Sequence, residues 1–187
     1  MEVNVRIDVK NVEKMLADFP ANIIPPAIAR ALNKTIQSAK STATKSIAAN
    51  IGIKQQDVRS VLDIDKANRN NLTAILKASS KRRLPVIKID PRATQDESGV
   101  SYKGQDGQIR HIDHAFIATM RSGHRGVFKR KPDAKRLPII ELPGPSIQKV
   151  FVNHAIQEAI KSAIDGRWQT NLDHEVWFEL QRRGYTK

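Results

Sequence analysis

The stretch PPAIARALNKTIQSAKSTATKSIAANIG, residues 25–52, decides how the rest of the chain is interpreted. Its apolar side chains recur at intervals of three and four residues, which is the spacing of one face of an α-helix. This stripe consists of Ile28, Leu32, Ile36, Ala39, Ala43 and Ile47. Pro25-Pro26 is tolerated in a first helical turn, and Gly52 suits the position just past a last turn. We therefore predict one long amphipathic helix that Asn22 can cap and that runs to about Asn50.

Most other positions of this helix, from Ala29 to Ala48, carry alanine, serine or threonine. Small side chains give a smooth surface that another element can approach closely. Two interpretations stay open. The helix packs on the chain's own sheet, or it forms a helix–helix contact between subunits, in which case the six stripe residues are the subunit-packing candidates.

Alternating and apolar runs predict strands on both sides of this helix. The predicted strands cover 2–9, 72–78, 84–89, 115–120, 126–130 and 137–142, with Pro85 at a strand start or edge. Shorter helices are predicted at 12–18 and 53–62, and Ser146 caps another that stops near Asp165-Gly166. A last helix follows from Trp168 to Leu180, and the polar residues 90–110 form either a hairpin or a mobile loop.

This order of elements predicts an α+β fold. The long N-terminal amphipathic helix and the C-terminal helices would pack on a mainly antiparallel β-sheet. We expect residues 1–165 to form a single α+β domain and residues 166–187 to form a C-terminal helical extension.

The composition excludes several classes of protein. The chain has 187 residues and no cysteine, so a disulfide framework and thiolate metal sites are ruled out. Its apolar runs are too short for a transmembrane helix, and the N-terminus lacks a signal-peptide pattern. A soluble, basic protein made inside the cell is expected.

The formal net charge of +13 is concentrated in the middle of the chain. Residues 81–140 hold 14 basic and 6 acidic residues, whereas residues 141–187 hold 6 of each. The densest run extends from 121 to 136 and contains Arg121, Arg125, Lys129, Arg130, Lys131, Lys135 and Arg136 against the single acid Asp133. It is a solvated loop, a contact for nucleic acid, or a contact for an acidic protein. Aromatic residues are sparse there, so a base-stacking platform is not supported.

The best candidate for chemistry is the run His111-Ile112-Asp113-His114, with His124 close in sequence. Imidazoles and a carboxylate are ligand types for zinc or iron. On a strand, however, His111 and Asp113 share a face and His114 points the other way. No phosphate-binding glycine loop and no serine nucleophile elbow is present. We therefore expect no catalytic residues, no metal site and no cofactor; a metal-dependent hydrolase built on these residues ranks last among the functions considered.

Two motifs follow one another in the basic half of the chain. Residues 115–130, AFIATMRSGHRGVFKR, predict a hairpin whose turn contains Gly123 and Gly126. Residues 137–146, LPIIELPGPS, predict a strand followed by a sharp turn at Gly144. Together with the alanine-, serine- and threonine-rich N-terminal helix and the chain length, they resemble the prophage minor tail protein Z family of tailed bacteriophages, also called tail completion proteins. The resemblance covers roughly residues 10–165.

The resemblance implies a structural virion protein rather than an enzyme, made in the host cytoplasm and located at the head-proximal end of the tail. It implies a homo-oligomeric, hexameric ring that finishes the tail and supports head–tail joining in contact with neck or tail proteins such as the tail terminator and the tail tube. No membrane is involved. The basic segment, with His124 added to the cations named above, would contact a partner protein or, non-specifically, the phage DNA in the channel. The alternative function is a sequence-independent DNA-binding protein that acts through residues 121–136.

Overall fold

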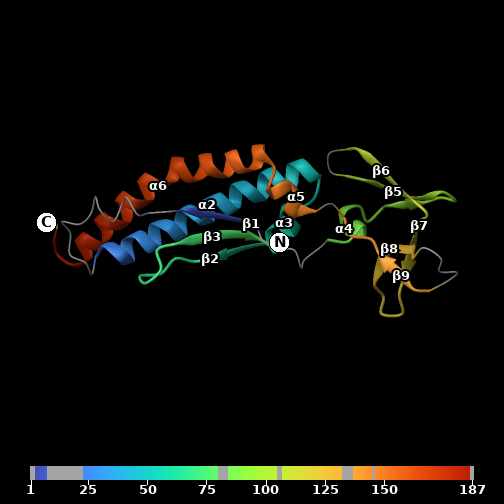
Figure 1. Ribbon diagram of the computed structural model, residues 1–187, viewed down its shortest axis with the longest axis horizontal. Coiled ribbons are helices and arrows are strands. Elements are labelled where there is room, and N and C mark those ends of the chain that lie inside the picture. Colours follow the sequence, from blue (N-terminus) through green and yellow to red (C-terminus); the bar gives the residue numbers. More distant parts are fainter. Residues whose placement is uncertain are drawn as a thin grey trace.

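A computed structural model describes residues 3–7, 23–79, 84–104, 107–131, 137–144 and 146–185. They form an elongated molecule with two lobes (Figure 1). The helical lobe is made of the described residues within 3–79 and 146–185, and two long helices lie in it beside a small sheet. The β lobe is made of the described residues within 84–144 and lies at one end of the molecule. The β lobe is therefore an insertion between two parts of the helical lobe.

The helical lobe contains β1 (Val3–Ile7), α2 (Ile24–Ile51), α3 (Gln55–Val61), β2 (Leu62–Asp65), β3 (Ala74–Ala78), α5 (Ile147–Phe151) and α6 (His154–Arg182). The β lobe contains α4 (Val86–Ile89), β4 (Thr94–Gln95), β5 (Gly99–Lys103), β6 (Ile109–Asp113), β7 (Ala115–Thr119), β8 (Arg125–Arg130) and β9 (Ile139–Glu141). The strands pair in the orders β1-β3-β2, β4-β5-β6 and β7-β8-β9, and every pairing is antiparallel. The α+β class is confirmed, with three small sheets in place of one.

The long helix α2 is the centre of the helical lobe. Pro25 and Pro26 occupy its first turn, and Gly52 ends it with a φ of 72°, a left-handed conformation that glycine adopts without strain. The six stripe residues Ile28, Leu32, Ile36, Ala39, Ala43 and Ile47 are all 0% exposed. They belong to one hydrophobic core with α6 and β3. A contact between subunits would therefore have to use other residues, because this stripe is already covered within the single chain.

The predicted strand at 84–89 is wrong. Val86–Ile89 form the short helix α4, which starts directly after Pro85. An apolar run this short cannot be assigned to helix or strand by its periodicity alone. Pro85 itself is extended and forms an isolated bridge with Pro143. The predicted helix at 53–62 is confirmed as α3, although its last residue, Leu62, already belongs to strand β2.

The predicted stop at Asp165-Gly166 is also wrong. The helix that Ser146 caps is the short α5, and Asn153 caps the next helix by accepting a hydrogen bond from the Ala155 N–H at 3.0 Å. From there α6 runs without a break through Gly166 to Arg182. The predicted domain boundary between residues 165 and 166 therefore lies inside a helix.

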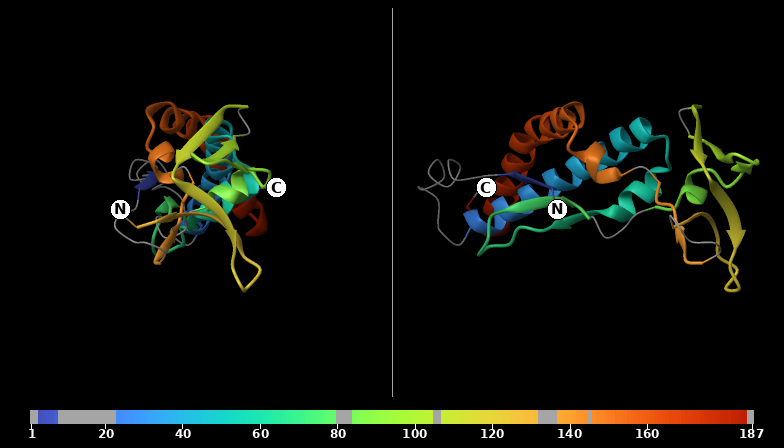
Figure 2. Two further views of the ribbon diagram at one scale, coloured as in Figure 1. Left: turned by 90° about the vertical axis from the view of Figure 1, so that its right-hand side faces the viewer. Right: turned by 45° about the vertical axis from the view of Figure 1, so that its right-hand side comes forward.

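Each lobe has its own hydrophobic core. The two lobes are joined where the chain enters and leaves the β lobe (Figure 2). At this joint the Gly144 N–H donates to the Leu84 carbonyl oxygen at 2.6 Å. A Cβ atom on Gly144 would lie 2.5 Å from Cδ1 of Ile89. Glycine at this position therefore allows close packing at the joint, which differs from the turn role that its sequence context predicts.

Some predictions concern residues outside the described part of the chain. These are the helix at 12–18, the capping role of Asn22, and the contacts of Lys135 and Arg136. For residues 90–110 the hairpin alternative is confirmed, because β5 pairs with β6 in the register Ser101↔His111.

Candidate functional site

The basic motif folds as the β7–β8 hairpin. Phe116 pairs with Phe128, and Ala118 pairs with Gly126. At the tip, the Met120 N–H donates to the His124 carbonyl oxygen at 2.8 Å and the Gly123 N–H donates to the Met120 carbonyl oxygen at 2.9 Å. Strand β9 completes the sheet on the far side of β8. The predicted hairpin is thus formed and carries the basic residues on a short, regular scaffold.

The two glycines of this motif have different surroundings. Gly123 lies in the turn with a φ of 80°, and a Cβ atom there would meet nothing within 4 Å. Gly126 instead lies in strand β8, where a Cβ atom would be 2.8 Å from Oε1 of Glu141 and 2.9 Å from the Phe128 ring. The turn role predicted for Gly126 is therefore replaced by close packing between β8 and its neighbours.

Three of the predicted contact residues have partners within the β lobe. The His124 ring nitrogen Nε2 lies 2.8 Å from Oε1 of Glu141. Arg125 donates from Nη1 to the Pro91 carbonyl oxygen at 2.9 Å. The guanidinium of Arg130 lies over the ring of Phe116, 5.2 Å from its centroid, a cation–π contact. The contacts of His124 and Arg125 fix the hairpin to the rest of the lobe, whereas the Arg130–Phe116 contact joins the two strands of the hairpin to each other.

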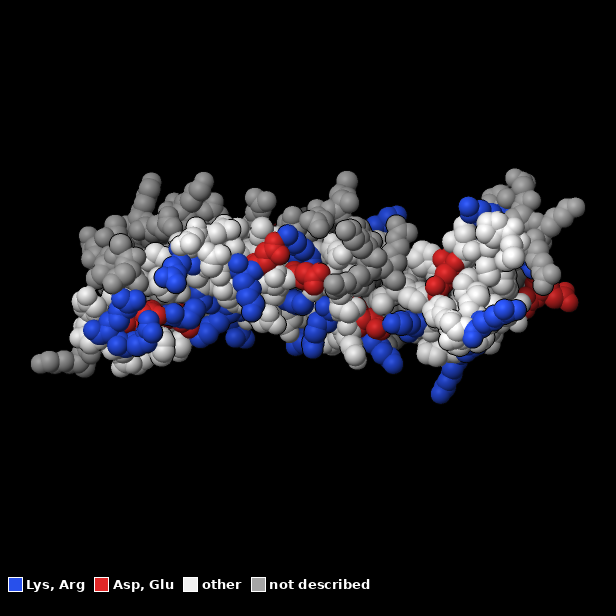
Figure 3. All heavy atoms as spheres, turned by 90° about the horizontal axis from the view of Figure 1, so that it is seen from below, with Lys and Arg blue, Asp and Glu red and all other residues white. Residues whose placement is uncertain are grey.

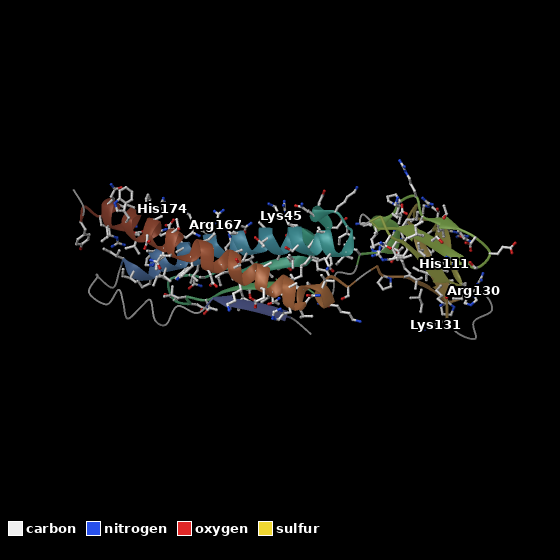
Figure 4. The ribbon with its side chains drawn as sticks, turned by 90° about the horizontal axis from the view of Figure 1, so that it is seen from above. Lys45, His111, Arg130, Lys131, Arg167 and His174 are labelled. Carbon is white, nitrogen blue, oxygen red and sulfur yellow. The ribbon has the colours of Figure 1, made fainter. Side chains whose placement is uncertain are left out.

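The other described cations of the hairpin are Arg121, Lys129 and Lys131, and all three are exposed. Within residues 84–104, 107–131 and 137–144, none of the three has an ion-pair partner. The side chains of Arg130 and Lys131 lie near each other on one side of the β lobe, and both project outward (Figure 4). The hairpin therefore presents to solvent three cations that have no ion-pair partner among the described residues.

Basic side chains are not confined to the β lobe. Figure 3 shows Lys and Arg distributed along both lobes on the face seen from below, with a few acidic side chains between them. The concentration of positive charge at 81–140 in sequence is thus less marked in space. The helical lobe contributes to the positive surface as well.

The histidine cluster does not assemble into a metal site. Both ring nitrogens of His111 are engaged by serine hydroxyls, Nε2 with Ser98 at 3.1 Å and Nδ1 with Ser101 at 2.8 Å. Asp113 lies 3.5 Å from His111, as alternate residues on one strand face should. His114 occupies the turn before β7 with a φ of 56°, and His124 is held by Glu141. In the described part of the chain, no three His, Asp or Glu side chains converge as metal ligands.

The Ser98 hydroxyl also contacts Asp96, at 2.5 Å from Oδ1. This hydroxyl and the backbone N–H groups of Ser98 and Gly99 lower the pKa of Asp96 below its ordinary value, because they hydrogen-bond to the ionised form. The carboxylate therefore organises the β4–β5 turn, in which Ser98 also supports His111. The result is a structural hydrogen-bond network in which His111 lies between Ser98 and Ser101, and Ser98 also contacts the Asp96 carboxylate.

A second charged cluster lies between the two long helices of the helical lobe. The sequence analysis did not predict it. Glu175 and Glu179 of α6 are 3% and 0% exposed. Arg30 Nε lies 2.5 Å from Glu175 Oε2, Arg30 Nη2 lies 2.6 Å from Glu179 Oε1, and Lys34 Nζ lies 2.5 Å from Glu175 Oε1. The i,i+4 spacing of both pairs is the only sequence signal for it. We call these four residues the interhelical ion cluster.

Contacts within the ion cluster shift the pKa values of Glu175, Glu179 and Arg30. Burial opposes ionisation of Glu175 and Glu179, but hydrogen bonds from Lys34 and Arg30 to Glu175, and from Arg182 and Arg30 to Glu179, outweigh it, so both pKa values are lowered. Burial likewise opposes the charge of Arg30, and its two glutamate partners raise its pKa above the ordinary value. Glu175, Glu179 and Arg30 are therefore charged at neutral pH.

Comparison with known proteins places the whole chain in one family. The model of the family described as prophage minor tail protein Z (GPZ) matches residues 9–186. No curated protein and no solved structure gives a significant match. No helix in the described residues is long and apolar enough to cross a membrane. The family match includes the basic hairpin, the ion cluster and all of α6, and it shows that this chain belongs to the prophage minor tail protein Z family.

Proposed function

We propose that this chain is the tail completion protein of a phage particle. In this role several copies, six in the simplest arrangement, form a ring at the head-proximal end of the tail, finish the tail and support its joining to the head. Membership in a family of phage minor tail proteins supports a structural role in the virion. The proposal goes further in assigning a position, a ring and a contact surface, and in assigning the protein no catalytic step.

The observation that carries this proposal is the exposed positive charge of the β7–β8 hairpin. Arg121, Lys129 and Lys131 lie on a lobe that has its own core and projects from the helical lobe. Unpaired surface charge of this kind steers association and selects an oppositely charged partner. Large apolar side chains are exposed on the same lobe, namely Ile109, Leu137 and Ile140. The β lobe thus combines charge and apolar surface, as contact surfaces between proteins do.

The partner of the hairpin is an acidic surface of an adjoining neck or tail protein, such as the tail terminator or tail tube. Phage DNA in the channel is the second candidate, and it is favoured by the basic side chains that extend over both lobes (Figure 3). The two partners differ in a measurable way. Binding to duplex DNA weakens steeply and linearly in log[salt], because each neutralised phosphate releases a counterion.

The test is charge reversal of residues that have no structural partner in the described chain. Arg125 is a poor choice, because it holds Pro91. The double variant Lys129→Glu/Lys131→Glu, supplied to a phage that lacks its own copy, should lower the yield of joined particles about tenfold or more, because like-charge contacts cost several kcal/mol. Its thermal unfolding should match that of the unmodified protein.

The matched control is Lys45→Glu, which reverses an exposed charge on α2 of the helical lobe. Lys45 projects from the lobe opposite the hairpin (Figure 4), and its reversal should leave assembly unchanged. Normal assembly of the hairpin variant would overturn the proposed contact. If the same variant assembles normal tails but binds duplex DNA much more weakly, the DNA-binding alternative is favoured.

A further inference from the structure

Helix α6 is attached to the helical lobe in two different ways. Before Gly166, the side chains of Ile156, Ile160 and Ile164 are buried in the core at every fourth position. After Gly166, Leu172 is the one fully buried apolar residue within the described helix, and the next two buried positions are Glu175 and Glu179. Trp168, Val176 and Leu180 are only partly buried. The C-terminal half is thus held by a thinner apolar stripe and by charge.

Gly166 marks the change from one mode to the other. It is exposed, and a Cβ atom there would meet nothing within 4 Å, so packing does not require a glycine. Glycine in a helix interior weakens the helix, because it gains the most backbone freedom when the helix opens. The local sequence Asp165-Gly166 is therefore a weak point in an otherwise continuous helix.

The ion pairs beyond this weak point are contacts whose charged groups water can solvate when the helices separate. The carboxylates of Glu175 and Glu179 bind Arg30 and Lys34 of α2 when the helices are closed. When they separate, all of these charges regain their hydration, so opening is less unfavourable than for apolar contacts of similar area. On α6 itself, Arg182 and Arg183 pair with Glu179 and stay with it when α6 moves. His174 faces Glu175 at 3.4 Å, and from the β2–β3 connection Lys66 lines the same hollow as Arg30 and Lys34.

The same segment exposes aromatic surface. Trp177 and Phe178 are 53% and 45% exposed, and the Phe178 ring lies 5.7 Å from the Arg30 guanidinium. Arg167 and His174 project from the outer side of this half of α6 (Figure 4). The Arg30–Phe178 contact is one more that this half of α6 loses when it opens, whereas the exposed parts of both rings are solvated in the closed state already.

We propose that residues 167–183 form an arm that opens from α2 as one unit, with Gly166 as its hinge and the interhelical ion cluster as its latch. This device depends on the fold of the helical lobe alone and is independent of the proposed role in the tail.

Amide hydrogen exchange of the full chain, read residue by residue along α6, tests the arm. A unit that opens at Gly166 predicts a step: similar, fast exchange from 167 to 183 and slow exchange from 154 to 165. Simple fraying predicts a gradient that rises smoothly towards Tyr185, and that result would overturn the proposal. Equal protection along the whole helix would overturn it as well.

Two variants separate the hinge from the latch. Glu179→Gln should accelerate exchange of the arm and leave 154–165 unchanged, while Glu158→Gln, an exposed position before the hinge, should change neither half. Gly166→Ala keeps the fold and should slow opening of the arm about fivefold, the factor that corresponds to the glycine–alanine difference in helix propensity. If Gly166→Ala does not change amide exchange in the arm, Gly166 is not the hinge. If Glu179→Gln accelerates exchange equally in both halves of α6, the ion cluster is not the latch.

Discussion

At the scale of single residues, the buried glutamates of the helical lobe depend on partners far away in sequence. Glu175 lies 145 positions from Arg30, its hydrogen-bond partner. Removing one partner of a buried pair leaves the other charge uncompensated, so such residues influence stability more than surface ion pairs do. Their effect has a defined dependence on pH.

The lowered pKa values of Glu175 and Glu179 predict acid sensitivity. In the unfolded chain these groups titrate at about 4.3. Because their folded pKa values lie lower, their contribution to stability is complete above the unfolded value and is lost as the pH falls towards the folded values. The free energy of unfolding of the double variant Glu175→Gln/Glu179→Gln, measured in urea, should therefore vary less between about pH 5 and about pH 3 than that of the unmodified protein. Parallel pH dependence of the two proteins would contradict this assignment.

The two glycines of the hairpin predict different outcomes for the same substitution. Gly126→Ala places a methyl group against Glu141 and Phe128 and should destabilise the protein by about 1–3 kcal/mol. Gly123→Ala meets no neighbour, but its φ of 80° makes it costly by about 1–2 kcal/mol.

Asparagine distinguishes the two mechanisms. It tolerates the left-handed region, so Gly123→Asn should recover most of the loss in free energy of unfolding. Gly126→Asn should be worse than Gly126→Ala because it is larger. Recovery at position 126, or its failure at position 123, would show that the two roles are assigned incorrectly.

At the scale of elements, the small side chains of α2 allow close contact with α6 within the chain. Ala39 is 0% exposed, so Ala39→Leu forces extra methyl groups into a filled core and should destabilise by about 1–3 kcal/mol or more. Ala49 is exposed near the end of the same helix, and Ala49→Leu should change the free energy of unfolding by less than about 0.5 kcal/mol. Chemical denaturation of both variants measures this difference. A neutral Ala39→Leu would mean that α2 does not approach its neighbours as closely as described.

The helices show what local sequence can and cannot predict. The stripe of α2 and its glycine stop are encoded within one segment, so its position was predictable to within a few residues. The boundary of α6 was not, because Asp165-Gly166 is a stop signal that burial of Ile164 and Leu172 on either side overrides. Apolar residues 84–89 were ambiguous between helix and strand, and in the structure α4 begins directly after the extended Pro85.

The candidate interface was predictable in part. Arg121, Lys129 and Lys131 are exposed on the hairpin that the sequence predicts, which turns at Gly123. The contacts of Arg125 with Pro91 and of His124 with Glu141 depend on residues brought close only by the folded β lobe. The same is true of the ion cluster, whose two halves come from opposite ends of the chain.

At the scale of the whole molecule, a self-contained helical lobe carries a β lobe at one end (Figure 1). The apolar stripe of α2 is buried within the single chain, so contacts with other proteins have to use the outer surfaces of the two lobes. The β lobe offers the hairpin cations and exposed apolar side chains, and α6 offers an exposed aromatic pair. In the proposed ring, the helical lobe of such an elongated chain would build the ring and the β lobe would reach a partner.

Electron cryo-microscopy of intact phage particles, with the chain identified by fitting its two-lobed shape into the density, tests the central claim most directly. We expect a ring of copies at the head-proximal end of the tail, with each β7–β8 hairpin against an acidic neighbouring protein or the channel DNA. Absence of the chain from the particle, or its presence only elsewhere in the tail, would contradict the account.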